Sequence, residues 1–297
     1  MLSRRALFLA SVGLPVLLKG CNTRQSQSTI NRLTIGVVSH GAGANLLEKF
    51  DRFRTYLATA TQSVVELEPA FNELKAVEQV QRQIWSIVFA PPGLAAIAMG
   101  TQQYVPLFAL QGSNNEQSVL LVQADSPIQR LGELANQTVA LGEPGSATGY
   151  YLPLYDLYGL TLKEIRFAPT PKSVLEWLDQ GEIAAGALSE QEFQQYRNEF
   201  GVERFRVLHK SRTVPAGVVL LAPTVDRNRQ YQIENAMRNA PSSVIGDAGY
   251  IPEADLPNYD QFIKLVAKVQ PLEDKVRQKP AVLTLDATAS GATETAE

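Results

Sequence analysis

The chain has 297 residues, 45% of them hydrophobic and 19% charged, which is enough apolar material for one large or two medium domains. Its formal net charge of −3 excludes a general affinity for nucleic acid, because that function requires a basic face. The single cysteine excludes an internal disulfide.

Residues 1–20 have the pattern of an export signal peptide. Arg4 and Arg5 give a positive start, and the apolar run ALFLASVGLPVLL that follows is shorter than the ~20 residues that span a membrane as a permanent helix. The segment around the two arginines is similar to a twin-arginine signal, so the Sec and twin-arginine routes both stay open. Removal of this segment also removes Lys19 and changes the net charge from −3 to about −6 (−3 minus 3).

Cys21 follows the signal segment in the context LLKGC, which resembles the bacterial lipobox. The cysteine of that motif is acylated, so the sequence predicts a membrane anchor at Cys21, with an ordinary free cysteine as the alternative. Residues 21–31 are polar and suit a tether between the anchor and the folded body. At the other end, residues 277–297 are predicted to be a disordered tail, because the stretch from 284 onward has few bulky apolar side chains.

Strands and helices alternate along the first part of the folded body. The predicted strands are 33–39, 64–67, 85–90 and 104–110, and the predicted helices are 44–60, 72–84 and 94–99. The sequence Pro91-Pro92-Gly93 ends a strand and starts a helix, where proline at the first turn has no cost. This alternation indicates an α/β fold with a parallel sheet and helices on both faces.

The same alternation resumes further along the chain. Strands are predicted at 118–122, 138–141, 164–167, 183–188, 204–208 and 218–221, with helices near 131 and at 148–157, 173–180 and 190–200, and the chain is mainly helical over 225–276. Two independent domains would explain this pattern, but we favour two lobes joined by two crossing strands, 118–122 and 218–221. Lobe one then comprises 32–114 and 222–276, and lobe two comprises 115–221. In such folds a ligand lies between the lobes, at strand C-termini and helix N-termini.

One turn in the predicted lobe two has the composition of an anion site. In LGEPGSATGYYLPLYDLY, which spans 141–158, Ser146 and Thr148 stand where side-chain oxygens cap a helix. The first N–H groups of a helix have no partner inside it, and the helix dipole makes that end partly positive. The turn could therefore hold phosphate, sulfate or carboxylate, although an ordinary capped helix explains the same residues.

The order of these motifs resembles the phosphate, phosphite and phosphonate substrate-binding proteins of ABC transporters, a branch of the type 2 periplasmic binding proteins. The resemblance runs from Leu33 to Val269, and the long middle block is its most specific part. The matching segments are LTIGVVS, SIVFAPPGLAAIAM, YVPLFAL, SVLLVQADSPIQRLGELANQTVALGEPGSATGYYLP, SVLEWLDQGEIAAGAL and SRTVPAG. The resemblance implies a bilobal fold and capture of a small oxyanion between the lobes, which then close and deliver it to a membrane permease and its ATPase.

The resemblance also implies a set of ligand-binding residues. The anion cradle of lobe two corresponds to Ser146, Thr148, Gly149 and Tyr150, together with Ser118 on the crossing strand. The contacts from lobe one correspond to Ser39, His40, Phe71 and the backbone at Ala90 and Pro91.

Four positions depart from the pattern of that family. Phe71 replaces a tyrosine, no histidine occurs around 170–172, and Ala184 and Ser86 replace aspartates. Because a site that hydrogen-bonds its ligand depends on such donors for discrimination, we expect a ligand other than a standard phosphonate.

No enzyme signature is present in the sequence. It contains no cluster of histidine, cysteine and carboxylate residues at metal-ligand spacing, no P-loop lysine after the Gly/Ser/Thr turn, and no nucleophile motif beside either histidine. The sequence therefore predicts a monomeric, non-catalytic binding protein without cofactor or metal, exported to the periplasm. The alternative is a sensor or interaction lipoprotein on the same scaffold with an altered ligand site, and an enzyme on this fold ranks last.

Overall fold

The computed structural model describes residues 31–38, 43–112 and 116–285. The signal peptide, Cys21 and all of the predicted tether except its last residue lie outside this part, as do Ser39 and His40. Within it, none of the helices has the length and apolar composition needed to cross a membrane.

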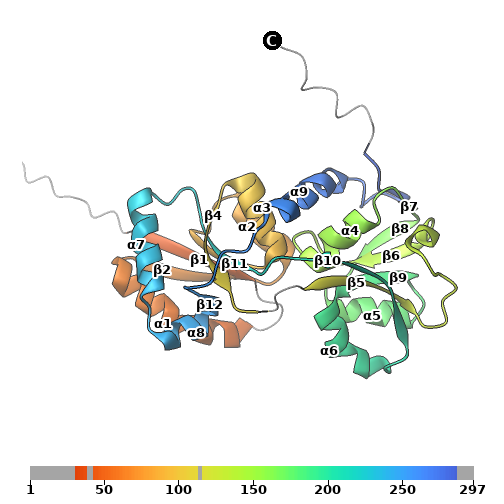
Figure 1. Cartoon of the computed structure of the whole chain (residues 1–297), viewed down its shortest axis with the longest axis horizontal. Helices are drawn as coiled ribbons and strands as arrows, with labels where there is room; N and C mark the ends of the chain where they lie inside the picture. The colour runs from red at the N-terminus through yellow and green to blue at the C-terminus, as the bar shows by residue number, and fades with distance from the viewer. Residues whose placement is uncertain (1–30, 39–42, 113–115, 286–297) are drawn as a thin grey trace, which may run out of the picture. The chain divides into compact units, whose positions relative to one another are not determined.

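Lobe one is built on a six-stranded sheet with the strand order β12-β4-β11-β3-β1-β2 (Figure 1). Strand β1 pairs in parallel with β2 and β3, whereas β11 runs antiparallel to β3 and β4, and β12 runs antiparallel to β4. Its strands are β1 (Arg32–Val38), β2 (Val64–Ala70), β3 (Ile87–Ala90), β4 (Val105–Leu110), β11 (Val218–Leu221) and β12 (Tyr250–Ile251). Its helices are α1 (Gly43–Thr61), α2 (Glu73–Gln81), α3 (Pro92–Gln102), α7 (Arg227–Arg238), α8 (Ser242–Ala248) and α9 (Asp260–Val269).

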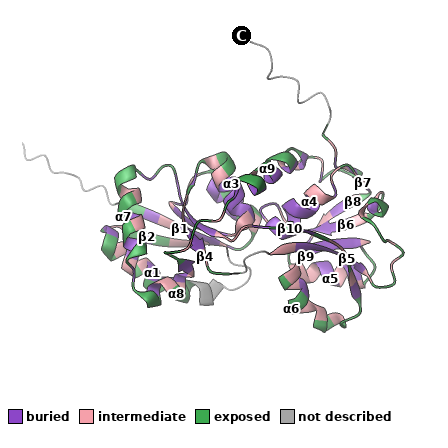
Figure 2. Ribbon diagram, viewed as in Figure 1, coloured by how far each residue is buried: buried purple, intermediate pink, exposed green. Residues whose placement is uncertain are grey.

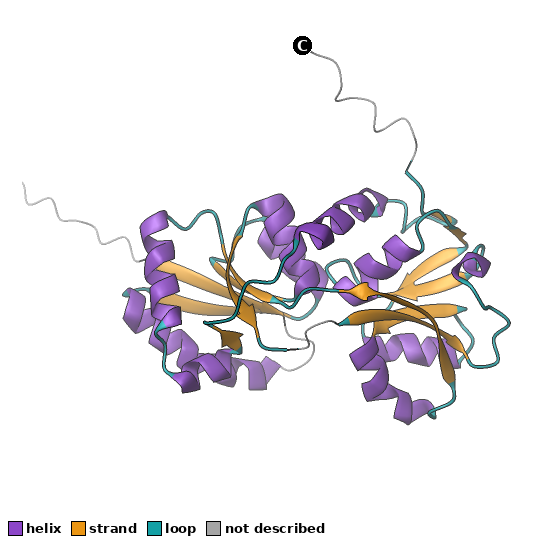
Figure 3. Cartoon of the chain, viewed as in Figure 1, coloured by secondary structure: helices purple, strands orange, loops and turns teal. Residues whose placement is uncertain are grey.

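Lobe two is built on a five-stranded sheet with the order β10-β5-β9-β6-β8. Strands β8, β6 and β9 are parallel, whereas β5 and β10 form an antiparallel edge. The strands are β5 (Gln117–Gln123), β6 (Thr138–Leu141), β8 (Glu164–Phe167), β9 (Ala185–Ser189) and β10 (Phe205–Thr213). The helices are η1 (Leu131–Leu134), η2 (Ala147–Tyr151), α4 (Leu152–Asp156), α5 (Pro171–Asp179) and α6 (Glu190–Phe200), as Figure 3 shows. The two sheets confirm the predicted α/β fold with two lobes.

The return from lobe two to lobe one lies earlier in the chain than the sequence indicated. Val218–Leu221 was expected to be a crossing strand at the end of lobe two, but it is the strand β11 inside the lobe-one sheet. All four residues are buried between β3 and β4, as a continuous apolar run requires of a central strand. The chain thus crosses between Leu110 and Gln117 and returns between Thr213 and Val218.

The C-terminal boundary also differs from the sequence expectation. Residues 277–285, which were assigned to the disordered tail, are part of the described structure. They contain the strand β13 (Ala281–Val282), which pairs with β7 (Thr161–Leu162) of lobe two, after the short helix η3 (Gln270–Leu272). Ala281 and Leu283 are fully buried, so this segment has the apolar anchors that its average composition conceals.

Aromatic side chains fill the core of lobe one, whose strands are largely buried (Figure 2). Phe50 and Phe53 of α1 meet Phe89 of β3 edge to face, with ring centroids 4.9 and 5.5 Å apart. Trp85, just before β3, is fully buried, and its carbonyl accepts a hydrogen bond from the Tyr104 hydroxyl at 2.9 Å. Such packed aromatic pairs give this lobe a rigid base for the loops that follow its strands.

Candidate functional site

The turn after β6 starts the helix that the sequence singled out. Ser146 is the N-cap of η2, and its Oγ accepts a hydrogen bond from the N–H of Gly149 at 3.0 Å, which confirms the predicted cap at Ser146. The helix η2 is a π-helix, in which the N–H of Tyr151 donates to the carbonyl of Ser146 at 3.1 Å, and it continues as α4. Short π-helical turns of this kind occur frequently at functional sites.

The backbone of this turn lies against lobe one. A Cβ atom added to Gly93, in the first turn of α3, would lie 2.0 Å from the carbonyl oxygen of Gly145 and 2.7 Å from the nitrogen of Ala147. Gly145 has a φ of +109°, and a Cβ there would lie 2.7 Å from the Cβ of Glu73. The two lobes therefore meet through main-chain atoms at a place where only glycine fits.

A small pocket of about 40 Å³ lies on one side of the turn, with room for little more than a water molecule. Three carboxylate side chains, of Glu73, Glu143 and Glu192, line it. The remaining lining comes mainly from lobe two: Gly142, Ser146, Gly149, Ala168, Pro169, Thr170, Pro171, Val174, Ala187 and Leu188.

A larger pocket of about 570 Å³ lies where the strands of lobe one end. It is bounded by the last residues of β1, the start of α3 and the two crossing segments, with Gln191 of α6 contributed by lobe two. Its charged lining residues are Lys49, Glu116 and Asp247, and Asp247 forms an ion pair of 2.9 Å with Arg52. The other lining residues are Val37, Val38, Phe50, Phe89, Pro91, Pro92, Leu110, Gln111, Gly112, Ala216, Gly217, Ala248 and Gly249.

Glu116 carries the most clearly perturbed carboxylate of the larger pocket. Burial, with the nearby Glu192 carboxylate as the next cause, raises the pKa of Glu116 above its usual 4.5, and a hydrogen bond with Ser189 opposes the rise. The folded chain thus binds this proton more readily than the unfolded chain. Its free energy of unfolding consequently falls as the pH rises from about 4.5 through the raised pKa.

We expect Glu116→Gln to remove the part of the fall in unfolding free energy with rising pH that Glu116 causes. The difference in unfolding free energy between the variant and the unsubstituted chain should favour the variant at neutral pH and shrink as the pH falls toward 4.5. Urea unfolding of both chains across this pH range measures the difference. A variant that is less stable than the unsubstituted chain at neutral pH would contradict the assignment.

The structure separates the predicted site residues into three groups. Pro91 lines the larger pocket, and Ser146 and Gly149 line the smaller one. Ser39 and His40 lie outside the described residues. The others line neither pocket, and they are Thr148, Tyr150, Ser118, Ala90 and Phe71.

The residues of this last group have other surroundings. Tyr150 is fully buried, with its ring 5.0 Å from that of Tyr151, and burial raises the pKa of its phenol. Ser118 is buried on the face of β5 that meets α4, beside Asp156 and His209. Ala90 is buried within the sheet, and Phe71 is 66% exposed.

Several lining residues had no signal in the sequence. Lys49 lies on α1, Glu116 precedes β5, and the run from Asp247 to Gly249 ends α8. They come from segments far apart in the chain, and none belongs to a motif. Among the described residues, no group of three histidine, cysteine, aspartate or glutamate side chains could hold a metal ion.

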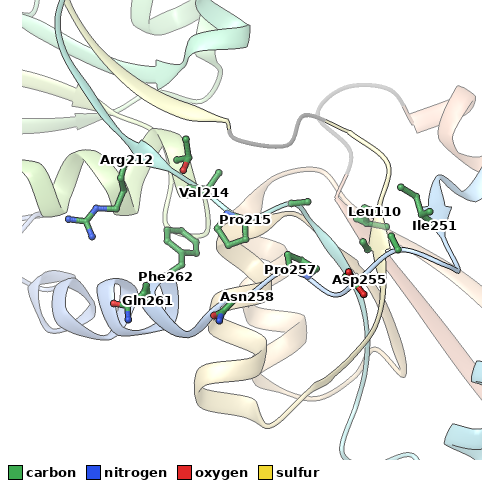
Figure 4. Close-up of a pocket in the computed structure, with 14 residues that line it drawn as sticks. Leu110, Arg212, Val214, Pro215, Ile251, Asp255, Pro257, Asn258, Gln261 and Phe262 are labelled. Carbon is green, nitrogen blue, oxygen red and sulfur yellow. The ribbon is translucent and has the colours of Figure 1, made fainter.

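A further cavity of about 550 Å³ lies beside the return crossing (Figure 4). Arg212 at the end of β10, with Val214 and Pro215 of that crossing, faces Gln261 and Phe262 of α9 across it. This lining contains none of the predicted site residues, and it shares Leu110 and Ala216 with the larger pocket.

The fold is similar to that of several solved protein structures. XAC2383 from Xanthomonas citri, bound to chloride ion, shares 20% identity over 82% of this chain and 99% of its own, with a TM-score of 0.67. PhnD1 from Prochlorococcus marinus in complex with methylphosphonate shares 15% over 81% of this chain and 98% of its own, with a TM-score of 0.60.

A binding protein component of an ABC phosphonate transporter, PA3383 from Pseudomonas aeruginosa, shares 13% identity over 83% of this chain and 87% of its own, with a TM-score of 0.58. These likenesses establish the type 2 periplasmic-binding-protein fold. No curated protein sequence matches the chain. The family model for "ABC transporter, phosphonate, periplasmic substrate-binding protein" matches residues 35–255, which is most of the chain. The chain therefore belongs to the periplasmic substrate-binding proteins of phosphonate ABC transporters, a non-catalytic family.

Proposed function

We propose that this protein captures a small oxyanion of the phosphonate, phosphite or phosphate type between its lobes and delivers it to an ABC permease and its ATPase. The observation that carries the proposal is the larger pocket, bounded by strand ends and a helix start in lobe one and by α6 of lobe two, in a chain of this family. Its volume of about 570 Å³ lies in the range typical of small-molecule sites. The fold neighbour PhnD1 is in complex with methylphosphonate.

The proposed anion contacts come from both lobes. Ser146 and Gly149 mark the start of η2, and Pro91 precedes α3, so two helix starts contribute positive potential. Lys49 adds a full positive charge at the larger pocket. Ser39 and His40, which follow β1, stay in the proposed site. Thr148, Tyr150 and Ser118 are proposed to have no direct ligand contact. They would instead hold the start of η2 and the strand β5 in place.

The charged residues that line the smaller and the larger pocket favour one class of oxyanion as the ligand. Among the described residues that line the two pockets, five carry carboxylates (Glu73, Glu116, Glu143, Glu192 and Asp247) and one is a lysine. Asp247 is already paired with Arg52, but the charge of Glu192 helps to raise the pKa of Glu116, and a bare dianion beside these two carboxylates would be repelled in the same way. We therefore propose an oxyanion that also carries an amino group, with the ammonium directed to Glu116 and Glu192.

Isothermal titration calorimetry tests this ligand class directly. We expect 2-aminoethylphosphonate to bind at least about tenfold more tightly than methylphosphonate, phosphite, phosphate or sulfate, since one compensated charge pair exceeds the ~1.4 kcal/mol that corresponds to tenfold. Equal affinities would remove the amino group from the proposal. The absence of binding for all five would favour the alternative of a sensor lipoprotein, which the acidic lining and the missing donors also fit.

We expect Ser146→Ala to weaken binding of the best of these ligands about fivefold to thirtyfold, because loss of an N-cap typically costs ~1–2 kcal/mol and releases the helix start. The matched control is Asp226→Ala, which removes the side-chain cap of α7, where Asp226 accepts from the N–H groups of Asn228 and Arg229. Asp226 lines neither pocket, so the control should lose stability but keep its affinity. Equal affinity losses in both variants would place Ser146 outside the site.

The lipid anchor remains a proposal from the sequence. Acylation at Cys21 would hold the protein at the membrane through the tether and keep it near its permease. A mass measurement of the mature N-terminus decides it: a diacylglyceryl cysteine is expected, and an unmodified chain that begins elsewhere would exclude the anchor.

A further inference from the structure

The chain connects the two lobes a third time, at its C-terminal end. Helix α9 contacts α3 of lobe one on one side and α4 and η2 of lobe two on the other (Figure 1). Residues 270–285 then continue onto lobe two and pair with it through β13. We refer to residues 270–285 as the strap.

The end of the strap is held by main-chain and side-chain contacts. The N–H of Gly159 donates to the carbonyl of Leu283 at 2.8 Å, and the N–H of Leu283 donates to the carbonyl of Leu160 at 2.9 Å. The Leu283 side chain is fully buried, and Lys279 forms an ion pair of 2.6 Å with Glu164. Buried apolar side chains supply most of the energy in such an attachment, whereas the exposed ion pair adds little.

The middle of the strap packs on lobe two, near β8 and η2. The guanidinium of Arg277 lies 5.3 Å from the ring of Phe167, and Leu272 and Val276 are buried. Burial, followed by the charge of the strap residue Glu273, raises the pKa of the Tyr151 phenol in η2. Helix α9, which leads into the strap, contacts η2, and the start of η2 lines the smaller pocket.

The place of attachment determines what the strap can restrict. Strands β5 and β10, which carry the two crossings, form one edge of the lobe-two sheet, and β8 forms the opposite edge. Strand β7, to which the strap is bound, directly precedes β8 in the chain. A rotation of the lobes about the two crossings must therefore displace the far edge, where the strap holds it.

The α9 end of the connection is also fixed. The Tyr259 hydroxyl donates to the carbonyl of Ala216, on the return crossing, at 2.6 Å. The ammonium of Lys268 lies 5.1 Å from the ring of Tyr155 and 4.9 Å from that of Tyr158, both in lobe two. These contacts fix the start of the strap, because the cation–π contacts and the partly buried hydrogen bond resist the same displacement.

We propose that the strap limits how far the lobes separate in the ligand-free protein. A wide separation of the lobes requires the strap to detach from lobe two, so the free energy of that detachment is added to the free energy of opening. The lobes then alternate between states that differ by a small angle, and the wide-open state is a minor population. This inference goes beyond the proposed function. Its test uses no ligand, so the role of the strap and the proposed ligand binding can fail independently of each other.

Distances between spin labels test the proposal. In the full chain with Cys21→Ser, nitroxide labels are attached at Arg82→Cys in lobe one and Gln195→Cys in lobe two, both exposed positions. The interlobe distance is measured by double electron–electron resonance without ligand. We expect Leu283→Asp to raise the population of long distances about tenfold or more, because a buried leucine anchor is lost. Val282→Asp, at the partly exposed residue of β13 that directly precedes Leu283, is the matched control and should leave the distribution unchanged.

Hydrogen exchange of the Gly159 amide shows independently whether the strap has detached. A native distance distribution in Leu283→Asp, measured while that amide has lost its protection, overturns the proposal. If Leu283→Asp does not unfold cooperatively, Leu283→Ala decides in its place, since it shortens the same buried anchor without placing a charge in the core. A longer-distance shoulder in this variant supports the proposal, and its absence overturns it.

Discussion

Gly93→Ala should weaken ligand binding about tenfold to a hundredfold while leaving each lobe folded. The new Cβ would lie 2.0 Å from the carbonyl oxygen of Gly145, where ordinary contact begins at 3.4 Å. The overlap is between a Cβ, which is fixed to the main chain, and a main-chain carbonyl oxygen, so no side-chain rotation can relieve it. Overpacking of this kind costs ~1–3 kcal/mol, and here the whole cost falls on the state in which the lobes are in contact.

The experiment compares Gly93→Ala with Gly132→Ala. A Cβ at Gly132 would meet no heavy atom within 4 Å, so this control carries the same chemical change without the overlap. Titration calorimetry gives the affinities, and thermal unfolding shows whether each variant folds. If Gly93→Ala binds as tightly as the control, the contact between Gly93 and Gly145 is not part of the ligand-bound state.

The sequence was sufficient to predict the two lobes, because periodic apolar patterns report directly on which elements are buried. The strands β1, β3 and β6 and the helix start at Ser146 lie within a few residues of their predicted places. Val218–Leu221 shows the limit of this reasoning. A fully apolar run indicates a buried strand, but it does not say which of two sheets contains it, and that choice moved the lobe boundary.

The site was harder to predict, because its lining is set by tertiary contacts. Tyr150 is four residues from Ser146, and the direction of its side chain depends on the turn that joins them. That turn is π-helical, which changes the rotation per residue and leaves the ring in the core. Glu116 and Asp247 reach the larger pocket from unrelated segments, so no local pattern could identify them. The carboxylate of Glu116, which lies near that of Glu192, is the reason why we propose a ligand that also carries an amino group.

Gly36→Ala should have the largest effect on stability. A Cβ at Gly36, in the middle of β1, would lie 1.9 Å from Cδ2 and 2.1 Å from Cε3 of Trp85. The indole is fully buried, and the carbonyl of the same residue is held by the Tyr104 hydroxyl, so the ring has nowhere to move. We expect a loss of ~3 kcal/mol or more in the free energy of unfolding, at the upper end of the overpacking range.

Urea unfolding measures this loss as a lower midpoint with an unchanged slope, and Gly246→Ala is the control, because a Cβ there meets no heavy atom within 4 Å. The clash makes a second, sharper prediction. Trp85→Phe alone should destabilise the chain by leaving a cavity, but in the Gly36→Ala background the smaller ring should relieve the overlap. The loss in free energy of unfolding in the double variant should therefore be smaller than the sum of the two single losses, by ~1 kcal/mol or more. Strictly additive losses would show that β1 itself moves to accommodate the alanine. In that case the close approach of the Trp85 indole would not be the reason for glycine at position 36.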